Sequence, residues 1–164
     1  MSGKPYRPNV GIALFNAAGL VLIARRIRDD GPEVIYPGAE WQMPQGGIDA
    51  QEEPRQAAMR ELFEETGVTG ASYLAETDWL TYDFPPYGGP PHRLAQFRGQ
   101  RQKWFAMRFT GEERSIDPLA TRNDAEPEFD QWRWERLETI PDLVVPYKRD
   151  VYRQIVTAFG SYAA

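Results

Sequence analysis

The sequence contains no cysteine and only one histidine, His92. The absence of cysteine excludes disulfide bonds, thiol nucleophiles and thiolate metal sites. One histidine is too few for a zinc site built from several histidines of one chain. A metal site formed by this chain therefore has to rely on oxygen ligands, which hard cations prefer.

Long apolar runs are also missing. No stretch approaches the roughly 18 apolar residues of a membrane-spanning helix, and the opening residues, MSGKPYRPNV, lack the apolar stretch of a signal peptide. Hydrophobic residues still make up 41% of the chain and aromatic residues 13%, which is enough for a core and argues against intrinsic disorder. We therefore expect a soluble, cytoplasmic protein, and the 164 residues suit one domain over residues 1–164.

Basic residues are outnumbered: 19 Lys and Arg stand against 24 Asp and Glu, so the net charge is −5 and the pI is about 5.0. This balance gives no general attraction for nucleic acid or an anionic membrane, and we expect neither a DNA nor a membrane partner. Most of the imbalance is local, because residues 46–68 hold six acids and two arginines, a net charge of −4.

The hydrophobic pattern predicts a mixed order of strands and two separated helices. Alternating or β-rich segments indicate strands at 9–14, 21–24, 41–43, 74–84, 103–110 and 129–134, the first two forming a hairpin. Residues 49–67 are expected to be helical, with Pro54 in the first turn and Gly67 just after the end. Pro146 opens a second, amphipathic helix. The proline-rich segment after 84 reads as a long surface loop, and the fold class is α/β or α+β.

The most informative feature is an acidic helix face. At about 100° per residue, Glu61, Glu64 and Glu65 lie on one side of the helix, opposite an apolar side. Such like charges destabilise a helix by about 0.2–0.5 kcal/mol per pair, so a bound hard cation such as Mg²⁺, Mn²⁺ or Ca²⁺ would relieve them. The plain alternative is a solvated acidic surface. Neither an EF-hand calcium loop nor a P-loop is present.

The spacing around these acids is specific. Residues 46–68, GGIDAQEEPRQAAMRELFEETGV, resemble the Nudix box G-x5-E-x7-R-E-U-x-E-E-x-G-U at every specified position. The resemblance implies a Nudix-type α/β/α sandwich with a mixed sheet, and hydrolysis that depends on Mg²⁺ or Mn²⁺. It assigns Glu61, Glu64 and Glu65 to metal-ligand positions. It assigns Glu52 and Arg60 to a pair that orients the loop and the helix, with Gly67 as a structural member of the motif.

The resemblance extends beyond the box. The segments 6–11, 41–47, 102–105, 127–130 and 147–152 are similar to a Nudix subgroup that contains bacterial RNA pyrophosphohydrolases and asymmetric diadenosine tetraphosphate hydrolases. The resemblance implies removal of pyrophosphate from the 5′ end of triphosphorylated RNA as the first hypothesis. Hydrolysis of diadenosine tetraphosphate or another dinucleoside polyphosphate is the second, and residues 79–86 resemble such enzymes of plants. A catalytically silent nucleotide-binding module is the third.

The same resemblance proposes further site residues. The catalytic candidates are Glu61, Glu65 and Glu128, and Glu128 is either a fourth metal ligand or the catalytic base. The substrate-binding candidates are Arg7, Arg26, Gln45, Gly46, Lys148 and Tyr147. The cations fit a phosphate chain, although each is equally consistent with a solvated surface charge. Tyr147 fits either stacking on a base or packing in the core. His92 is expected to be an exposed loop residue, in a loop able to close over substrate.

Overall fold

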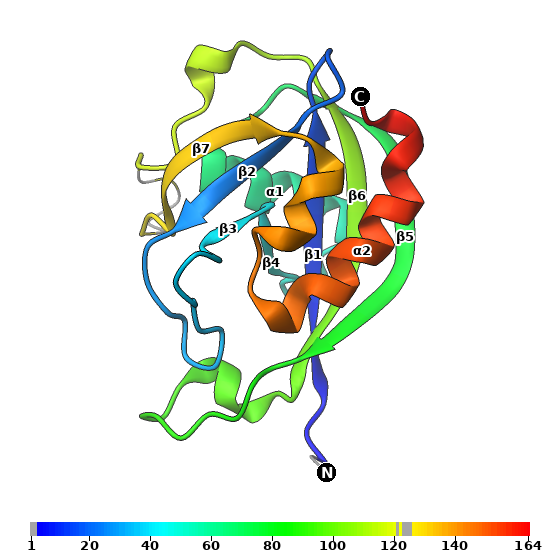
Figure 1. The fold of residues 1–164 in the computed structure, drawn as a ribbon. Helices are drawn as coiled ribbons and strands as arrows, with labels where there is room; N and C mark the ends of the chain where they lie inside the picture. The colour runs from blue at the N-terminus through cyan, green and yellow to red at the C-terminus, as the bar shows by residue number, and fades with distance from the viewer. Residues whose placement is uncertain (1–2, 121, 123–125) are drawn as a thin grey trace.

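The computed structural model describes residues 3–120, 122 and 126–164, so the first two residues of the expected domain lie outside the described part. These described residues form seven strands and two α-helices, arranged as Figure 1 shows. The strands are β1 (Tyr6–Phe15), β2 (Val21–Arg26), β3 (Trp41–Gln42), β4 (Gln45–Gly47), β5 (Ala71–Asp83), β6 (Gly99–Phe109) and β7 (Phe129–Glu135). The helices are α1 (Pro54–Thr66) and α2 (Arg149–Phe159). Short 3₁₀ turns include η1 (Arg93–Gln96), η3 (Leu137–Asp142) and η4 (Pro146–Lys148).

The strands form one mixed sheet. Its main order is β3-β2-β1-β6-β5, with β4 paired to β1 and β7 paired to β2. The long strands β1 and β6 run parallel, whereas the other pairs are antiparallel. The mixed sheet expected from the sequence is therefore confirmed.

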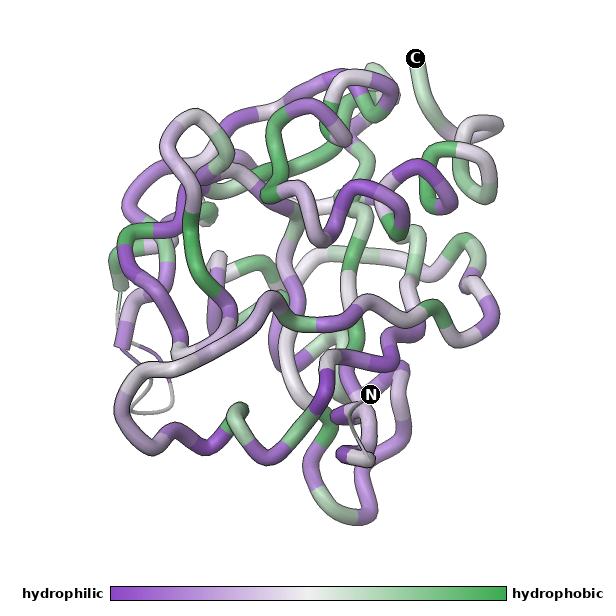
Figure 2. Tube along the Cα trace, turned by 60° about the horizontal axis from the view of Figure 1, so that its bottom comes forward, coloured by the Kyte–Doolittle hydropathy of each residue, from purple (hydrophilic) through white to green (hydrophobic). Residues whose placement is uncertain are grey.

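One helix covers each face of the sheet (Figure 1). The alternation along β1 sends Val10 and Ile12 into a cluster with Leu62 of α1, and sends Phe15 into a second cluster with Ile155 of α2. Because side chains alternate along a strand, a single apolar strand serves both layers. This arrangement confirms the α/β/α sandwich. The apolar positions are spread over many short stretches of chain (Figure 2).

Helix α1, which carries the acids, ends where the sequence predicted. Gly67 follows α1 with a φ of 84°, a left-handed conformation that favours glycine, and its N–H donates to the carbonyl of Phe63. At the N-terminal end the helix begins at Pro54, which therefore lies in the first turn as expected, while residues 49–53 precede the helix. Glu53 and Gln56 form a capping box there, which fixes the first turn.

The strands and loops add detail to the expectations. Antiparallel β1 and β2 form the expected hairpin, but they pair only at Phe15 and Val21, because β3 pairs with β2 at Ala24 and Arg25 and β4 pairs with β1 at residues 9–11. Strand β4 was not foreseen. Residues 85–91 of the proline-rich segment form no helix or strand, as expected, while η1 follows them and buries Leu94, whose exposed fraction is 1%. No helix in the described part of the chain has the length and apolarity to cross a membrane.

Candidate active site

A polar cavity of about 410 Å³ opens at the end of the sheet where β4 meets α1. Its walls come from β1, β2, the 28–33 loop, β4, α1, Arg93 of the proline-rich loop and the 126–128 segment. The lining combines four arginines (Arg7, Arg26, Arg28 and Arg93) with six acids (Asp29, Asp30, Glu33, Glu61, Glu126 and Glu128). Asn9, Gln42, Gln45, Gln100, Gly46 and Gly47 complete it. A cavity with both charges suits an anion that arrives together with cations.

Arg60 connects the acidic helix to the loop that precedes it. Its guanidinium donates to both carboxylate oxygens of Glu52, at 2.8 and 2.9 Å, and to the carbonyl of Gly47 at 2.8 Å. The same group donates to Oε1 of Glu61 at 2.8 Å and to Oε1 of Glu64 at 3.0 Å. The structure thus brings together the two residues that the resemblance assigned to orienting the loop and the helix. Arg60 also offsets part of the acidic charge.

Glu65 has no such support. Its residue is only 7% exposed, and neither carboxylate oxygen has a hydrogen-bond partner among the described residues. Loss of hydration, followed by repulsion from Glu128 and Glu61, raises the pKa of Glu65 well above its usual range, and the nearby backbone of Gln45 opposes this rise. Burial also raises the pKa of Glu61 to about 7, although Arg60 opposes the shift. A buried carboxylate without a partner is unfavourable, so this helix face is poised for a cation.

Glu128 faces the same cavity from the segment before β7. Loss of hydration and the nearby charge of Asp30 raise its pKa, while Arg26, Arg93 and Lys148 oppose that shift. Its repulsion of Glu61 and Glu65 shows that the three carboxyl groups sense one another across the cavity. The structure therefore brings Glu128 to the acidic helix, as expected for a residue acting beside it.

The carboxylates are not arranged as a finished metal cage. Within the part of the chain that the structure describes, no group of three or more acidic or histidine side chains is positioned to hold an ion. The reason is visible at Arg60, which engages Glu61 and Glu64 itself. The unpartnered oxygens of Glu65 nevertheless fit a hard divalent cation, which prefers carboxylate oxygen. The metal-ligand assignment of Glu61, Glu64, Glu65 and Glu128 stays a prediction.

Four of the six substrate-binding candidates line the cavity: Arg7, Arg26, Gln45 and Gly46. The Arg7 guanidinium lies over Gly47, where an added Cβ would be 2.2 Å from Nη2. Gly46 faces Glu61 even more closely, because a Cβ there would be 2.1 Å from the carboxyl carbon. Both glycines thus allow a side chain to approach the backbone as no other residue would. On Arg26, Nη1 is buried without a hydrogen-bond partner among the described residues.

Lys148 lies behind the cavity wall rather than in the lining, so its assignment as a phosphate contact stays a prediction. The side chain is buried, with a residue exposure of 0%, and it is not part of the cavity lining. Its ammonium donates to Oε1 of Gln42 at 2.9 Å and pairs with Oε1 of Glu33 at 3.0 Å. Burial lowers the pKa of Lys148 to about 8, opposed by Glu33, so the ammonium is charged at pH 7.

Glu33 organises a polar network beneath the cavity. Tyr82 donates to Oε2 of Glu33 at 2.5 Å, and the amide of Gln45 donates to the hydroxyl of Tyr82 at 3.2 Å. Glu33, Gln42 and Gln45 all line the cavity, so this network connects Lys148 to the cavity wall indirectly. No pattern near Glu33 in the sequence indicated this role, because its side-chain partners come from β4, β5 and η4.

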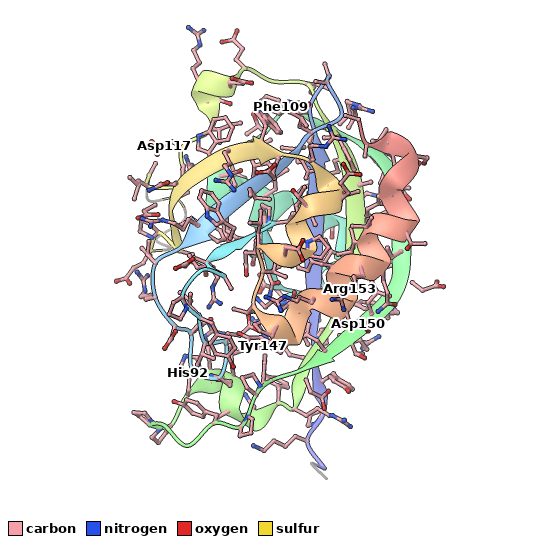
Figure 3. All side chains as sticks on the ribbon, in the orientation of Figure 1. His92, Phe109, Asp117, Tyr147, Asp150 and Arg153 are labelled. Atoms are coloured by element: carbon pink, nitrogen blue, oxygen red, sulfur yellow. The ribbon has the colours of Figure 1, made fainter. Side chains whose placement is uncertain are left out.

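Tyr147 has the packing of a core aromatic, one of the two alternatives that the sequence left open. Its ring contacts those of Tyr36 and Tyr82, with centroids 6.1 and 5.9 Å away, and its hydroxyl donates to the carbonyl of Val34 at 2.7 Å. His92, labelled in Figure 3, lies just before η1. It is half-buried rather than exposed. Its Nε2 lies 3.0 Å from Oδ1 of Asp30.

Known proteins match this chain over nearly its whole length. Residues 5–155 match the family model described as the NUDIX domain. An RNA pyrophosphohydrolase from Brucella ovis is 48% identical over 161 residues, covering 98% of this chain and 90% of that protein. An RNA pyrophosphohydrolase from Acidiphilium cryptum is 48% identical over 165 residues, covering 97% of this chain and 93% of that protein.

Solved structures agree on the fold. The MutT protein from Methanosarcina mazei matches with a TM-score of 0.64 at 19% identity, over 96% of this chain and 98% of that one. An Ap4A hydrolase from C. elegans matches with a TM-score of 0.63 at 18% identity, over 94% of this chain and 98% of that one. Together with the sequence matches, these findings show that the chain belongs to the Nudix family, as the motif at residues 46–68 predicted.

Proposed function

We propose that this protein is a divalent-metal-dependent pyrophosphohydrolase that removes pyrophosphate from the 5′ end of triphosphorylated RNA. The observation that carries the proposal is the cavity in which the desolvated Glu61 and Glu128 face four arginines, beside the unpartnered Glu65. Two relatives that are 48% identical over nearly the whole chain are RNA pyrophosphohydrolases, which supports this substrate over other polyphosphates.

Nudix hydrolases generally need divalent cations, and the donor set here fits Mg²⁺ or Mn²⁺. Glu61, Glu64, Glu65 and Glu128 would hold the cation, after Glu61 and Glu64 exchange their bonds to Arg60 for it. A bound divalent cation supplies charge neutralisation for phosphate oxygens and makes water more acidic. Without it, the carboxylates would repel the substrate's phosphates.

The chain's own residues supply orientation and proton transfer. Arg7 and Arg26 would donate to phosphate oxygens, because a guanidinium fork matches that geometry. In the alternative in which Glu128 is not a metal ligand, it would accept the proton of the attacking water, and the upward shift that burial gives its pKa suits a base. Gly46 and Gly47 keep the backbone clear of these side chains.

The test compares substrates side by side. We expect purified protein with Mg²⁺ or Mn²⁺ to convert 5′-triphosphate RNA to 5′-monophosphate RNA plus pyrophosphate, with a higher kcat/KM than for diadenosine tetraphosphate, and to stop when a chelator is added. A higher kcat/KM for diadenosine tetraphosphate, with ATP and AMP as products, would transfer the proposal to that substrate. Binding of nucleotides without any hydrolysis would instead support a silent module.

The acidic balance of the chain favours keeping the second substrate in the comparison. A net charge of −5 offers no broad basic surface for a long RNA backbone, so recognition must come from the 5′ end itself. We expect short triphosphorylated RNA to be processed as well as long RNA. A cytoplasmic location belongs to the same proposal.

A further inference from the structure

One arginine of the cavity comes from an element that the proposed function has not used. Arg93 lies at the start of η1 in the proline-rich loop and lines the cavity opposite the acidic helix. Its Nη2 donates to Oδ2 of Asp30 at 2.9 Å, and its side chain remains 57% exposed. A guanidinium has five N–H donors, so one bond to Asp30 leaves others to face the cavity.

The loop is fixed on both sides of Arg93. The next residue, Leu94, is buried with 1% of its surface exposed, and its N–H donates to Nδ1 of His92 at 3.1 Å. The other nitrogen of His92 reaches Asp30 at 3.0 Å. The imidazole ring of His92 packs directly on the backbone of Gly31, where an added Cβ would lie 2.4 Å from Nδ1 of His92. Arg93 is therefore held by its neighbours rather than free on a loose loop.

The charge of Arg93 acts on the cavity itself. Burial lowers the pKa of Arg7, and the charge of Arg93 lowers it further; Arg93 also opposes the rise in pKa that burial gives Glu128. Arg7, Arg93 and Glu128 line the same cavity, so Arg93 lies near both a phosphate-binding candidate and a catalytic candidate. An anion between these groups would be within reach of Arg7 and Arg93 together.

We propose that Arg93 is a substrate-binding residue that contacts the phosphate chain from the proline-rich loop, and that Asp30 is its positioning residue. Asp30 engages Arg93 and His92 at once, and so joins the loop to the 29–33 segment at the cavity mouth. The inference rests on the proposed function for the nature of the ligand, a polyphosphate. It adds a residue that neither the acidic helix nor its motif predicts.

The first experiment replaces Arg93 by alanine. Because a charge-assisted bond to phosphate is lost, we expect KM for 5′-triphosphate RNA to rise about tenfold or more, with kcat within about twofold of the unchanged protein. Arg93→Lys should recover part of the loss, since the charge remains but the fork is lost. Arg136→Ala is the matched control, because Arg136 is 58% exposed and also pairs with one carboxylate, Glu138, at 2.7 Å.

A binding measurement separates this inference from the proposed function. The probe is a nucleoside triphosphate analogue with methylene groups in place of both anhydride oxygens, titrated with Mg²⁺ present. We expect Arg93→Ala to weaken its binding about tenfold or more, and this outcome does not depend on whether the unchanged protein hydrolyses RNA. Unchanged binding of this probe, or a rise in KM confined to long RNA, would overturn the contact with the phosphate chain.

Asp30 is tested through a double-mutant cycle. We expect Asp30→Asn to raise KM about threefold in the unchanged protein and to have no effect in the Arg93→Ala background, because Asp30 acts through Arg93. An equal effect in both backgrounds would show that Asp30 does not position Arg93. Thermal unfolding of each variant shows whether the loop remains docked.

Discussion

Two groups of buried charge lie next to each other in this protein and are treated in opposite ways. Beneath the cavity, Lys148 and Glu33 form a pair whose polar atoms are bonded to each other, to Gln42 and to Tyr82. On the acidic helix, Glu65 is buried with neither oxygen bonded to a described residue. In the first arrangement, Lys148 and Glu33 balance each other's charge. In the second, the carboxyl group of Glu65 has no positively charged side chain bonded to it among the described residues.

This difference distinguishes a buried charge that stabilises the fold from a buried charge that is available to bind a ligand. Burying a charge is unfavourable unless it is paired, and a chain that keeps an unpaired one holds a site at which an outside partner completes the pairing. Lys148 resembled a phosphate ligand in the sequence, yet it already has its counter-charge in Glu33. Glu65 resembled a metal ligand, and its surroundings are consistent with that role.

The largest effect is expected from breaking the balanced pair. Lys148→Met leaves Glu33 buried without its counter-charge, which should lower the free energy of unfolding by about 3–5 kcal/mol. Chemical denaturation would measure it. The double variant Lys148→Met with Glu33→Gln should lose much less, because no uncompensated charge remains. A double variant as unstable as the single one would show that the pair is not balanced in this way.

The second prediction concerns the unbalanced charge. Glu65→Gln should lower kcat at least about a hundredfold, since loss of a proposed metal ligand should cost more than loss of an outer partner. The metal-free variant should unfold at the same temperature as the unchanged protein or higher, because a repelled carboxylate is removed. The exposed Glu112→Gln is the control, with both properties unchanged. Near-normal turnover in Glu65→Gln would contradict the role.

The third prediction concerns the stability that a bound divalent cation adds through Glu65. Mg²⁺ or Mn²⁺ at a hundred times its dissociation constant should stabilise the unchanged protein by about 2.7 kcal/mol, because the ion binds only the folded chain. A thermal-shift titration would show this gain in the unchanged protein and lose it in Glu65→Gln. Equal gains in both proteins would place the ion elsewhere.

The last prediction concerns the pH dependence of the metal-free protein. The pKa of Glu61 is raised from 4.5 to about 7, so the folded state holds this proton more tightly than the unfolded state. Its contribution to stability is therefore full below pH 4.5 and is lost as the pH rises toward 7. Denaturation in chelator at a series of pH values would show the fall, which Glu61→Gln should remove. A slope of the same size in Glu61→Gln would assign it to another group.

Much of the fold and half of the site could be predicted because their causes are local. The i, i+3 and i+4 spacing of Glu61, Glu64 and Glu65 fixes one helix face whatever surrounds it. Gly67 ends that helix because its backbone has a left-handed φ. The alternating pattern at residues 9–14 likewise indicated a strand, and β1 covers these residues.

Other expectations failed where a residue's partner is distant in the sequence. Strand β4 exists because β1 offers it a partner, not because its three residues prefer that form. Arg93 reaches Asp30 across 63 positions of the chain, and no pattern around either residue indicated the pair.

The sequence by itself determined the acidic helix face, the Nudix motif and the positions of the main strands along the chain. Each of these depends on residues close together in the chain. Only the tertiary structure decided which charges are paired. Lys148 is bonded to a side chain 106 positions away, and Arg93 enters the cavity because its loop docks on Gly31 through His92. Whether a buried charge is satisfied depends on what the fold brings to it, and spacing alone does not carry that information.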